Sequence, residues 1–423
     1  MTPSRMANPT VMLLGRLAGL ALWLFLFSIP SEKSVEIPGL GTVSRLLGGA
    51  AMGIGLIAIA ARGAFRIPGP FHLAMSLFVI WSAMTYQWSM MPEWTGERLI
   101  TYVQLLAMAF LIWEFCPREA DVTRLMSAYV CGTLVPALDT AQRFLRGQQT
   151  YYQRFATSGF DPNDLALTLS LSLPISYYLS LRRDGWTRWL FIVQMIITAV
   201  IVLLTASRGG LLTMLVGLSL VLTARSEVFP SSRNNQLIGA VLVAAGLCAV
   251  VWIVPVATWK RLATLSSEVS QGTLNSRTVL WNGGWQAFGN VPVHGVGAGA
   301  YPESLSPILG RPRNFTAVAH NSFLSVLVET GLIGFVLFAL TLATLIAAVA
   351  GTGRLERRFW FTVLATWGLG VSALTWEHRK PTWVVFGLLA AHTAAIGVSR
   401  SPSGRRPFIA YQQQETFAAA RAT

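Results

Sequence analysis

Long apolar segments separated by short polar stretches follow one another along almost the whole chain. Most are close to the roughly twenty residues that an α-helix needs to cross the hydrocarbon core of a bilayer. The pattern therefore predicts an all-α, polytopic membrane protein with about twelve transmembrane helices. The predicted segments are 8–30, 39–61, 71–89, 98–116, 125–142, 163–181, 188–206, 209–224, 237–257, 321–349, 359–376 and 381–398.

The composition excludes most other classes of protein. Of the 423 residues, 53% are hydrophobic and 12% are charged, against about 25% charged residues in an ordinary soluble domain. This is too little polar surface for a soluble enzyme, and the apolar content excludes a fibrous or disordered chain. The three cysteines, Cys116, Cys131 and Cys248, lie in or beside apolar segments. Their spacing predicts neither a disulfide framework nor a zinc site.

The charges predict an orientation. The chain has a formal net charge of +14, which in a soluble protein would suggest nucleic acid, but membrane proteins place Lys and Arg in cytoplasmic loops. The short loops on the side of the two termini carry more basic residues than those on the other side. Both termini are therefore predicted to be cytoplasmic, and the large loop 258–320, before the tenth helix, periplasmic. The first segment is interpreted as a retained helix, because it is long and no A-x-A cleavage site follows it.

We therefore expect residues 1–398 to form a single integral membrane domain. The remaining residues, 399–423, are polar and rich in Gln. This composition is typical of a disordered segment, here a cytoplasmic tail.

A tight turn between the seventh and eighth segments carries an arginine followed by two glycines, in the sequence Ser207-Arg208-Gly209-Gly210. An arginine at membrane depth costs roughly 2.5–3.5 kcal/mol on insertion scales, so it normally faces a partner or a polar cavity. Arg208 could bind an anion at the outer surface, since the glycines allow a ligand to approach the backbone. It could instead snorkel to the interface or pair with a carboxylate.

A second arginine, Arg277, begins a stretch in which Trp281, Trp285 and Phe288 follow at helical spacing. One face of a helix would then carry an arginine and three aromatic rings. The aromatic residues are typical of an interfacial helix and are expected to dock it on the membrane domain. For Arg277 two interpretations stay open: the solvent end of this helix, or a guanidinium held over the headgroup plane.

The Gly-rich stretch 292–299 is interpreted as a tight turn in preference to a phosphate cradle, because its spacing matches no P-loop. His320 directly precedes the tenth segment, where Asn321 or Ser322 would cap a helix. A helix N-terminus attracts phosphate, and a histidine beside it could accept a proton from a sugar hydroxyl. Glu329, two turns further on, needs a partner, either Arg208 or Arg277, or belongs to the site itself.

Together these residues predict a site for a lipid diphosphate, because arginine forks match phosphate geometry. No D-x-D motif occurs in the chain, so the usual metal–diphosphate clamp of many glycosyltransferases has no obvious ligands. The sequence therefore predicts no metal site.

At these residues the chain resembles the O-antigen ligase/polymerase superfamily of bacterial inner-membrane proteins. The resemblance rests on the turn Ser207 to Gly210, the R-x-x-x-W unit from Arg277 to Trp281, the Gly-rich stretch from Pro292 to Gly299, and the run from His320 to Gly334. Their order and the large loop before the tenth helix also fit. The strongest part covers about 190–345.

The resemblance implies a metal-independent, inverting glycosyltransferase without cofactors, which transfers a glycan from undecaprenyl diphosphate to an acceptor at the periplasmic face of the inner membrane. It implies that Arg208 and Arg277 bind the donor diphosphate and that His320 is the catalytic base. We count Asn321 and Glu329 with the substrate-binding residues. The segment Gly159 to Ala166 resembles the start of a span in many members, and Arg154 nearby is a candidate saccharide or phosphate contact.

The acceptor stays open. Ligases of the family use lipid A–core, polymerases use another lipid-linked repeat unit, and related enzymes use protein hydroxyls. The segment around Asp161 and Asp164 is more similar to members associated with exopolysaccharide. From another class, a transporter or flippase for a lipid-linked oligosaccharide could also have twelve spans and outer arginines, but the long loop after the ninth segment favours an enzyme acting at one face.

Overall fold

The computed structural model describes residues 9–37, 39, 41–150, 154–224, 254–263, 277–312 and 316–400, and it confirms the all-α class. One small antiparallel pairing, of β1 (Glu36–Ile37) with β2 (Gly41–Thr42), and two 3-10 turns, η1 (Ile29–Ser31) and η2 (Thr85–Trp88), accompany the helices. The α-helices in the described ranges are α1 (Pro9–Ser28), α2 (Val43–Arg62), α3 (Pro70–Met84), α4 (Pro92–Phe115), α5 (Glu119–Leu145), α6 (Pro162–Leu181), α7 (Trp186–Leu204), α8 (Arg208–Thr223), α11 (Val256–Ala263), α13 (Arg277–Asn290), α14 (Tyr301–Leu309), α15 (Ser322–Ala350), α16 (Arg354–Val371) and α17 (Lys380–Arg400).

Eleven of the twelve predicted segments coincide with a described helix. The exception is 237–257, most of which lies outside the described residues, as do Asn275, Ser276 and the tail after residue 400. By length and composition, five described helices are long and apolar enough to cross a membrane, namely α1, α2, α4, α7 and α15. The number of crossings and the side on which loop 258–320 lies therefore remain predictions.

The helices that begin near the candidate site do so at residues that cap them. The side chains of Asp161, Ser207 and Asn321 accept hydrogen bonds from the first amides of α6, α8 and α15, respectively. Such residues satisfy amides that have no partner inside the helix. Proline occupies the first position of α6, where its missing amide has no cost. These boundaries are properties of the local sequence.

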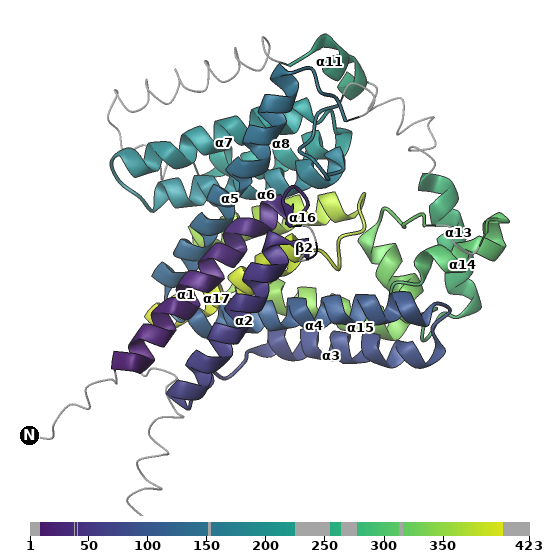
Figure 1. Cartoon of the computed structure of the whole chain (residues 1–423), viewed down its shortest axis with the longest axis horizontal. Helices are drawn as coiled ribbons and strands as arrows, with labels where there is room; N and C mark the ends of the chain where they lie inside the picture. Colours follow the sequence, from purple (N-terminus) through teal and green to yellow (C-terminus); the bar gives the residue numbers. More distant parts are fainter. Residues whose placement is uncertain are drawn as a thin grey trace, which may run out of the picture.

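The helices differ in how much of their surface faces other helices (Figure 1). Helices α3, α4 and α15 run side by side, and α6 packs against α5, α7 and α8. Helix α17 packs against α4, α5, α15 and α16 and is buried along nearly its whole described length. Helix α6 is likewise buried from Leu165 to Ser180. Polar residues are tolerated in α6, because the helix contacts protein and not lipid.

Helix α15 is interrupted at Gly331, whose φ of 66° and ψ of −171° are not helical. The Gly-rich stretch 292–299 lies in this break. The amides of Val296 and Gly297 donate to the carbonyls of Val328 and Glu329, and the amide of Leu332 donates to the carbonyl of Pro292 at 2.8 Å. The stretch thus satisfies the backbone groups that the break frees, as buried or membrane-embedded backbone requires.

Glycine is required at this crossing. A Cβ on Gly295 would lie 2.5 Å from the carbonyl oxygen of Glu329, and one on Gly331 would lie 2.3 Å from that of Val293. Every amide from Gly295 to Ala300 donates to an acceptor within the protein. The stretch is therefore a structural plug, in line with the turn interpretation, and the amides from Gly295 to Ala300 are not available to a phosphate.

Candidate functional site

The candidate site lies where the first turns of α6, α8, α13 and α15 come together. Asn163, in the first turn of α6, links two of them: its Oδ1 accepts a hydrogen bond from the Ser207 hydroxyl at 2.8 Å and another from the Arg154 guanidinium at 2.8 Å. Ser207 is the cap of α8 and precedes Arg208. Close packing of these helices depends on Gly210, because a Cβ there would lie 2.5 Å from that of Ala166. This turn holds Arg208 beside the start of α6.

The loop between α16 and α17 joins α6 to His320. The Trp376 indole donates to Asp164 at 2.9 Å, and Asp164 also pairs with Lys33 at 3.0 Å. In the neighbouring position, the Thr375 hydroxyl accepts a hydrogen bond from the His320 amide at 2.9 Å. Contacts from Asp164 through Trp376 and Thr375 therefore fix the backbone of His320 relative to α6.

Helix α13 is attached to the same place. The Trp281 indole donates to the carbonyl of Ala319, the residue before His320, at 2.9 Å. Helix α13 packs through a face of small residues, Gly283, Gly284 and Ala287, against α14 and α15. The expectation that the aromatic face docks the helix is thus only partly met. Of its three rings, Trp281 and Phe288 pack against this part of the protein, whereas Trp285 is 57% exposed.

Both arginines occupy the first turn of a helix, Arg208 in α8 and Arg277 in α13. The helix dipole disfavours a cation there by about 0.3–1 kcal/mol, so their placement does not serve helix stability. Burial lowers the pKa of Arg277. The negative charge of Asp161 opposes this shift, and the positive charge of Arg208 adds to it. Arg277 thus lies near a second guanidinium group, that of Arg208, and near the carboxylate of Asp161.

His320 has a left-handed backbone, with φ of 48°, which is uncommon for a residue other than glycine and costs roughly 1–3 kcal/mol. Its contacts to Thr375 and, through Ala319, to Trp281 maintain this conformation. Burial and then the charge of Arg277 lower the pKa of His320, and Asp161 and Asp164 oppose the shift. The imidazole is therefore neutral at pH 7 and able to accept a proton.

Arg154 lies beneath this surface and not on it. It is 3% exposed, and its guanidinium donates to the Thr205 carbonyl at 2.9 Å as well as to Asn163. Thr205 precedes the turn that carries Arg208. These contacts give Arg154 a role in shaping the turn between α7 and α8.

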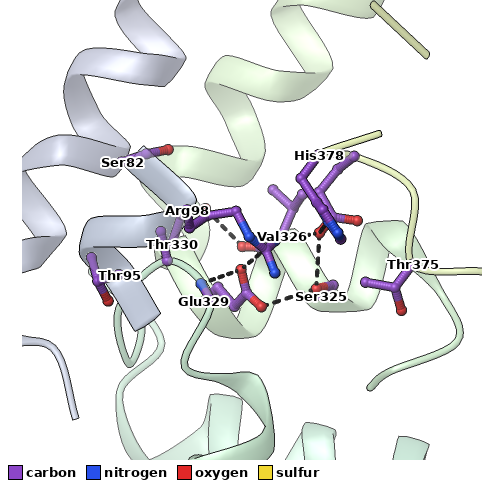
Figure 2. Close-up of polar contacts among 12 residues, drawn as sticks. Ser82, Thr95, Arg98, Ser325, Val326, Glu329, Thr330, Thr375 and His378 are labelled. Carbon is purple, nitrogen blue, oxygen red and sulfur yellow. Dashed lines mark hydrogen bonds and ion pairs between the residues drawn. The ribbon is translucent and has the colours of Figure 1, made fainter. Parts of the chain in front are cut away.

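Glu329 lies in a separate, buried cluster (Figure 2). Its carboxylate accepts hydrogen bonds from Ser325 at 3.2 Å and from the Gly299 amide at 2.7 Å, and pairs with Arg98 at 3.5 Å. The partner is therefore Arg98 of α4, and not Arg208 or Arg277 as the sequence led us to expect. Arg98 is within reach of Glu329 because the plug lies against both helices: a Cβ on Gly299 would lie 3.3 Å from that of Arg98, and the Gly297 amide donates to the Glu329 carbonyl.

The second carboxylate of this cluster is Glu377, which pairs with Arg98 at 2.8 Å and accepts a hydrogen bond from His378 Nδ1 at 3.0 Å. Burial alone would raise the pKa of Glu377, but the neighbouring His378 and Arg98 lower it below its ordinary value. Burial and Arg98 lower the pKa of His378 to about 4. The cluster therefore holds one cation, two acidic side chains and a neutral imidazole.

Sequence reasoning missed Thr375, Trp376, Arg98 and Glu377. Arg98 and Glu377 carry a usable signal, because a charge at or beside an apolar segment needs a partner, but the rule does not say which one. Thr375 and Trp376 lie in a short turn and carry no signal. In the described ranges, no group of three or more His, Cys, Asp or Glu side chains could hold a metal ion.

Comparison with known proteins places this region in a family context. Residues 193–339 match the family model Wzy_C, described as O-Antigen ligase. The match includes Arg208, Arg277, His320 and Glu329. The chain is also 26% identical over 291 residues to the exopolysaccharide production protein ExoQ of Rhizobium meliloti (strain 1021), and this similarity spans 64% of each of the two chains. The two findings confirm the resemblance to the O-antigen ligase/polymerase superfamily and, with the apolar helices, indicate a multi-pass bacterial membrane protein.

Proposed function

We propose that this protein is a metal-independent, inverting glycosyltransferase of the O-antigen ligase/polymerase type. It would transfer a glycan from undecaprenyl diphosphate to an acceptor hydroxyl at the periplasmic face of the inner membrane. The observation that carries the proposal is the convergence of Arg208, Arg277 and a neutral His320 at the starts of three helices. The match to an O-Antigen ligase model over the same residues supports it.

The donor diphosphate would bind between Arg208 and Arg277. Two phosphates relieve the repulsion between the guanidinium groups, and each can accept two parallel hydrogen bonds from an arginine fork. The N-terminus of α8 adds a favourable dipole for negative charge. As the sugar–phosphate bond breaks, charge builds up on the leaving diphosphate, where these groups stabilise it most.

His320 would act as general base. The acceptor oxygen attacks the anomeric carbon from the face opposite the diphosphate, so the configuration inverts, while its proton passes to a ring nitrogen of His320. One C–O bond forms and one breaks, and the diphosphate leaves with the bonding electron pair. Asn321 would shape the site by capping α15, because its Oδ1 is occupied by the amides of Phe323 and Leu324.

The relative named for exopolysaccharide production favours an exopolysaccharide product over lipopolysaccharide. The acceptor would then be a hydroxyl group of another lipid-linked repeat unit. The match covers 64% of that relative, so this assignment belongs to the proposal.

Purified full-length protein in detergent tests the proposed function. We expect it to release undecaprenyl diphosphate from a lipid-linked donor only when a lipid-linked acceptor is present. A transporter or flippase would bind the donor and release nothing. Absence of release with folded protein, supplied with donor and acceptor isolated from the same bacterium, would contradict a transferase.

Deletion of the gene followed by gel analysis of glycans separates the two transferase types. Loss of long chains with accumulation of single lipid-linked repeat units indicates a polymerase. Retained lipid-linked polymer together with loss of glycan-bearing lipopolysaccharide indicates a ligase.

A further inference from the structure

A cavity of about 90 Å³ lies between α1, α2 and α4, apart from the candidate active site. Its inner walls are apolar, with Phe25, Met52, Leu105 and Met108 among the lining residues. Exposed apolar side chains flank it: Leu46 of α2, and Ile100 and Val103 of α4. Both α2 and α4 are long and apolar enough to cross a membrane, which suits a surface in contact with lipid.

One end of the cavity is polar and basic. Arg45 and Lys380 line it together with Ser44, Thr101 and Gln104. Lys380 is held there by Glu32 and by the Ser44 hydroxyl, which lies 3.4 Å from its ammonium. Lys33, next to Glu32, pairs with Asp164 of the candidate site, so this end of the cavity lies at the same end of the helix bundle as His320.

Two polar side chains at this end are left without partners in the described part of the chain. The Arg45 guanidinium and the Gln104 amide are both exposed, and neither forms a hydrogen bond or ion pair with a described residue. Polar groups at the edge of an apolar surface are costly unless something satisfies them. An anion that also accepts a hydrogen bond from an amide would satisfy both.

The net charge at this end of the cavity indicates which anion would bind there. Arg45 and Lys380 are positive and Glu32 is negative, which leaves about one positive charge. A phosphodiester carries one negative charge and fits this balance, whereas a diphosphate carries more. We propose that the cavity binds one anionic glycerophospholipid of the surrounding bilayer, its phosphodiester on Arg45 and Lys380 and one acyl chain along Phe25, Met52 and Met108. The proposal does not rest on the transferase activity.

Native mass spectrometry of the full chain tests this site. Protein is reconstituted with a mixture of phosphatidylglycerol, phosphatidylethanolamine and undecaprenyl phosphate, then delipidated in steps with detergent. We expect wild-type protein to retain one phosphatidylglycerol, and Arg45→Gln to bind it about tenfold more weakly, the scale of one lost charge-assisted hydrogen bond. The matched control is Arg16→Gln, since Arg16 also lies in an apolar helix but does not line the cavity.

A second variant, Met52→Trp, fills the apolar part and leaves both cations in place, and it too should lose the lipid. Thermal unfolding in detergent identifies a variant that does not fold, and Arg45→Lys then replaces Arg45→Gln, with partial retention expected. Equal retention by folded Arg45→Gln and Arg16→Gln would overturn the proposal. Preferential retention of undecaprenyl phosphate would also overturn it, because the site would then belong to a polyprenyl chain.

Discussion

Two regions of this protein hold a histidine beside an arginine and carboxylates, and they differ in how the charges are balanced. Around His320, the two arginines at helix starts repel each other and the region is only partly buried. Around His378, Arg98 lies between two carboxylates, and Glu329 and Glu377 are almost completely buried. The first region is partly accessible to a ligand, whereas the second is closed and pairs its charges within itself.

The comparison shows that residue types alone do not mark an active site. The pKa of both histidines is lowered, by burial first and by a neighbouring arginine next. His378 forms a hydrogen bond with Glu377, which also pairs with Arg98. These contacts fit a structural role, in which the cluster links α4, α15 and the loop before α17. His320 has no such carboxylate among the hydrogen bonds of the described residues, which suits a group that exchanges protons with a substrate. The following predictions test this division.

The largest effect is expected at His320. His320→Ala should lower the rate of transfer by about 10²–10⁴-fold, the usual contribution of a positioned general base, while donor binding and expression stay near wild type. The measurement is release of undecaprenyl diphosphate by purified protein. His294→Ala is the matched control, since His294 is exposed and contacts Trp88 and the Gly295 carbonyl. If His294→Ala were inactive and His320→Ala active, the proposed base would be wrong.

Arg98 should matter for folding before it matters for chemistry. Arg98→Met leaves two buried carboxylates without their cation, and removal of one partner from a buried ion pair costs about 3–5 kcal/mol. We expect a lower thermal unfolding temperature in detergent and less protein in the membrane. The double variant Arg98→Met/Glu377→Gln should recover part of the loss, because only one carboxylate then stays unpaired.

A different outcome at Arg98 would break the comparison. If Arg98→Met folded as well as wild type but lost transfer, the cluster of Arg98, Glu329 and Glu377 would belong to the active site.

Arg208→Lys and Arg277→Lys should each reduce transfer by about 10–100-fold although the charge is kept. Lysine offers a point charge in place of a planar fork, so a bidentate contact to phosphate is lost, on the scale of one hydrogen bond to a charged group. Membrane levels should stay unchanged. Arg146→Lys, at an exposed arginine near the same predicted side, serves as control. Near-normal activity in both site variants would show that the diphosphate does not bind between these two arginines.

The smallest expected effect is on the pH profile. Because the pKa of His320 is lowered, a base with this pKa loses activity only as the pH falls below about 6.5, its ordinary value. Arg277→Gln removes the positive charge that disfavours the imidazolium, so the acidic limb of the residual activity should move to higher pH. The measurement is kcat/KM between pH 5 and 8 for both proteins. An unchanged limb would show that Arg277 does not act on the titrating group.

The helical class and most helix positions can be predicted from the sequence, because both depend on local properties. A run of about twenty apolar residues forms a helix wherever it is embedded, and caps such as Asp161, Ser207 and Asn321 act within their own turn. The same locality made Arg208, Arg277 and His320 recognisable as site candidates, since each occupies a helix start next to an apolar segment. Exposure of a helix to lipid or protein is not local, and α6 shows this by its buried polar residues.

Which charged side chains pair with one another depends on how the helices pack. The position of Glu329 in an apolar segment requires a partner, but the choice of Arg98 depended on the plug, which lies against Arg98 through Gly299 and against Glu329 through Gly297. The docking face of α13 was decided in the same way: Gly283 and Gly284 allow close approach to α14 and α15, and only two of the three aromatic rings, Trp281 and Phe288, pack there. Pairing and close packing depend on distances between segments far apart in the chain, and residue types along one segment do not contain those distances.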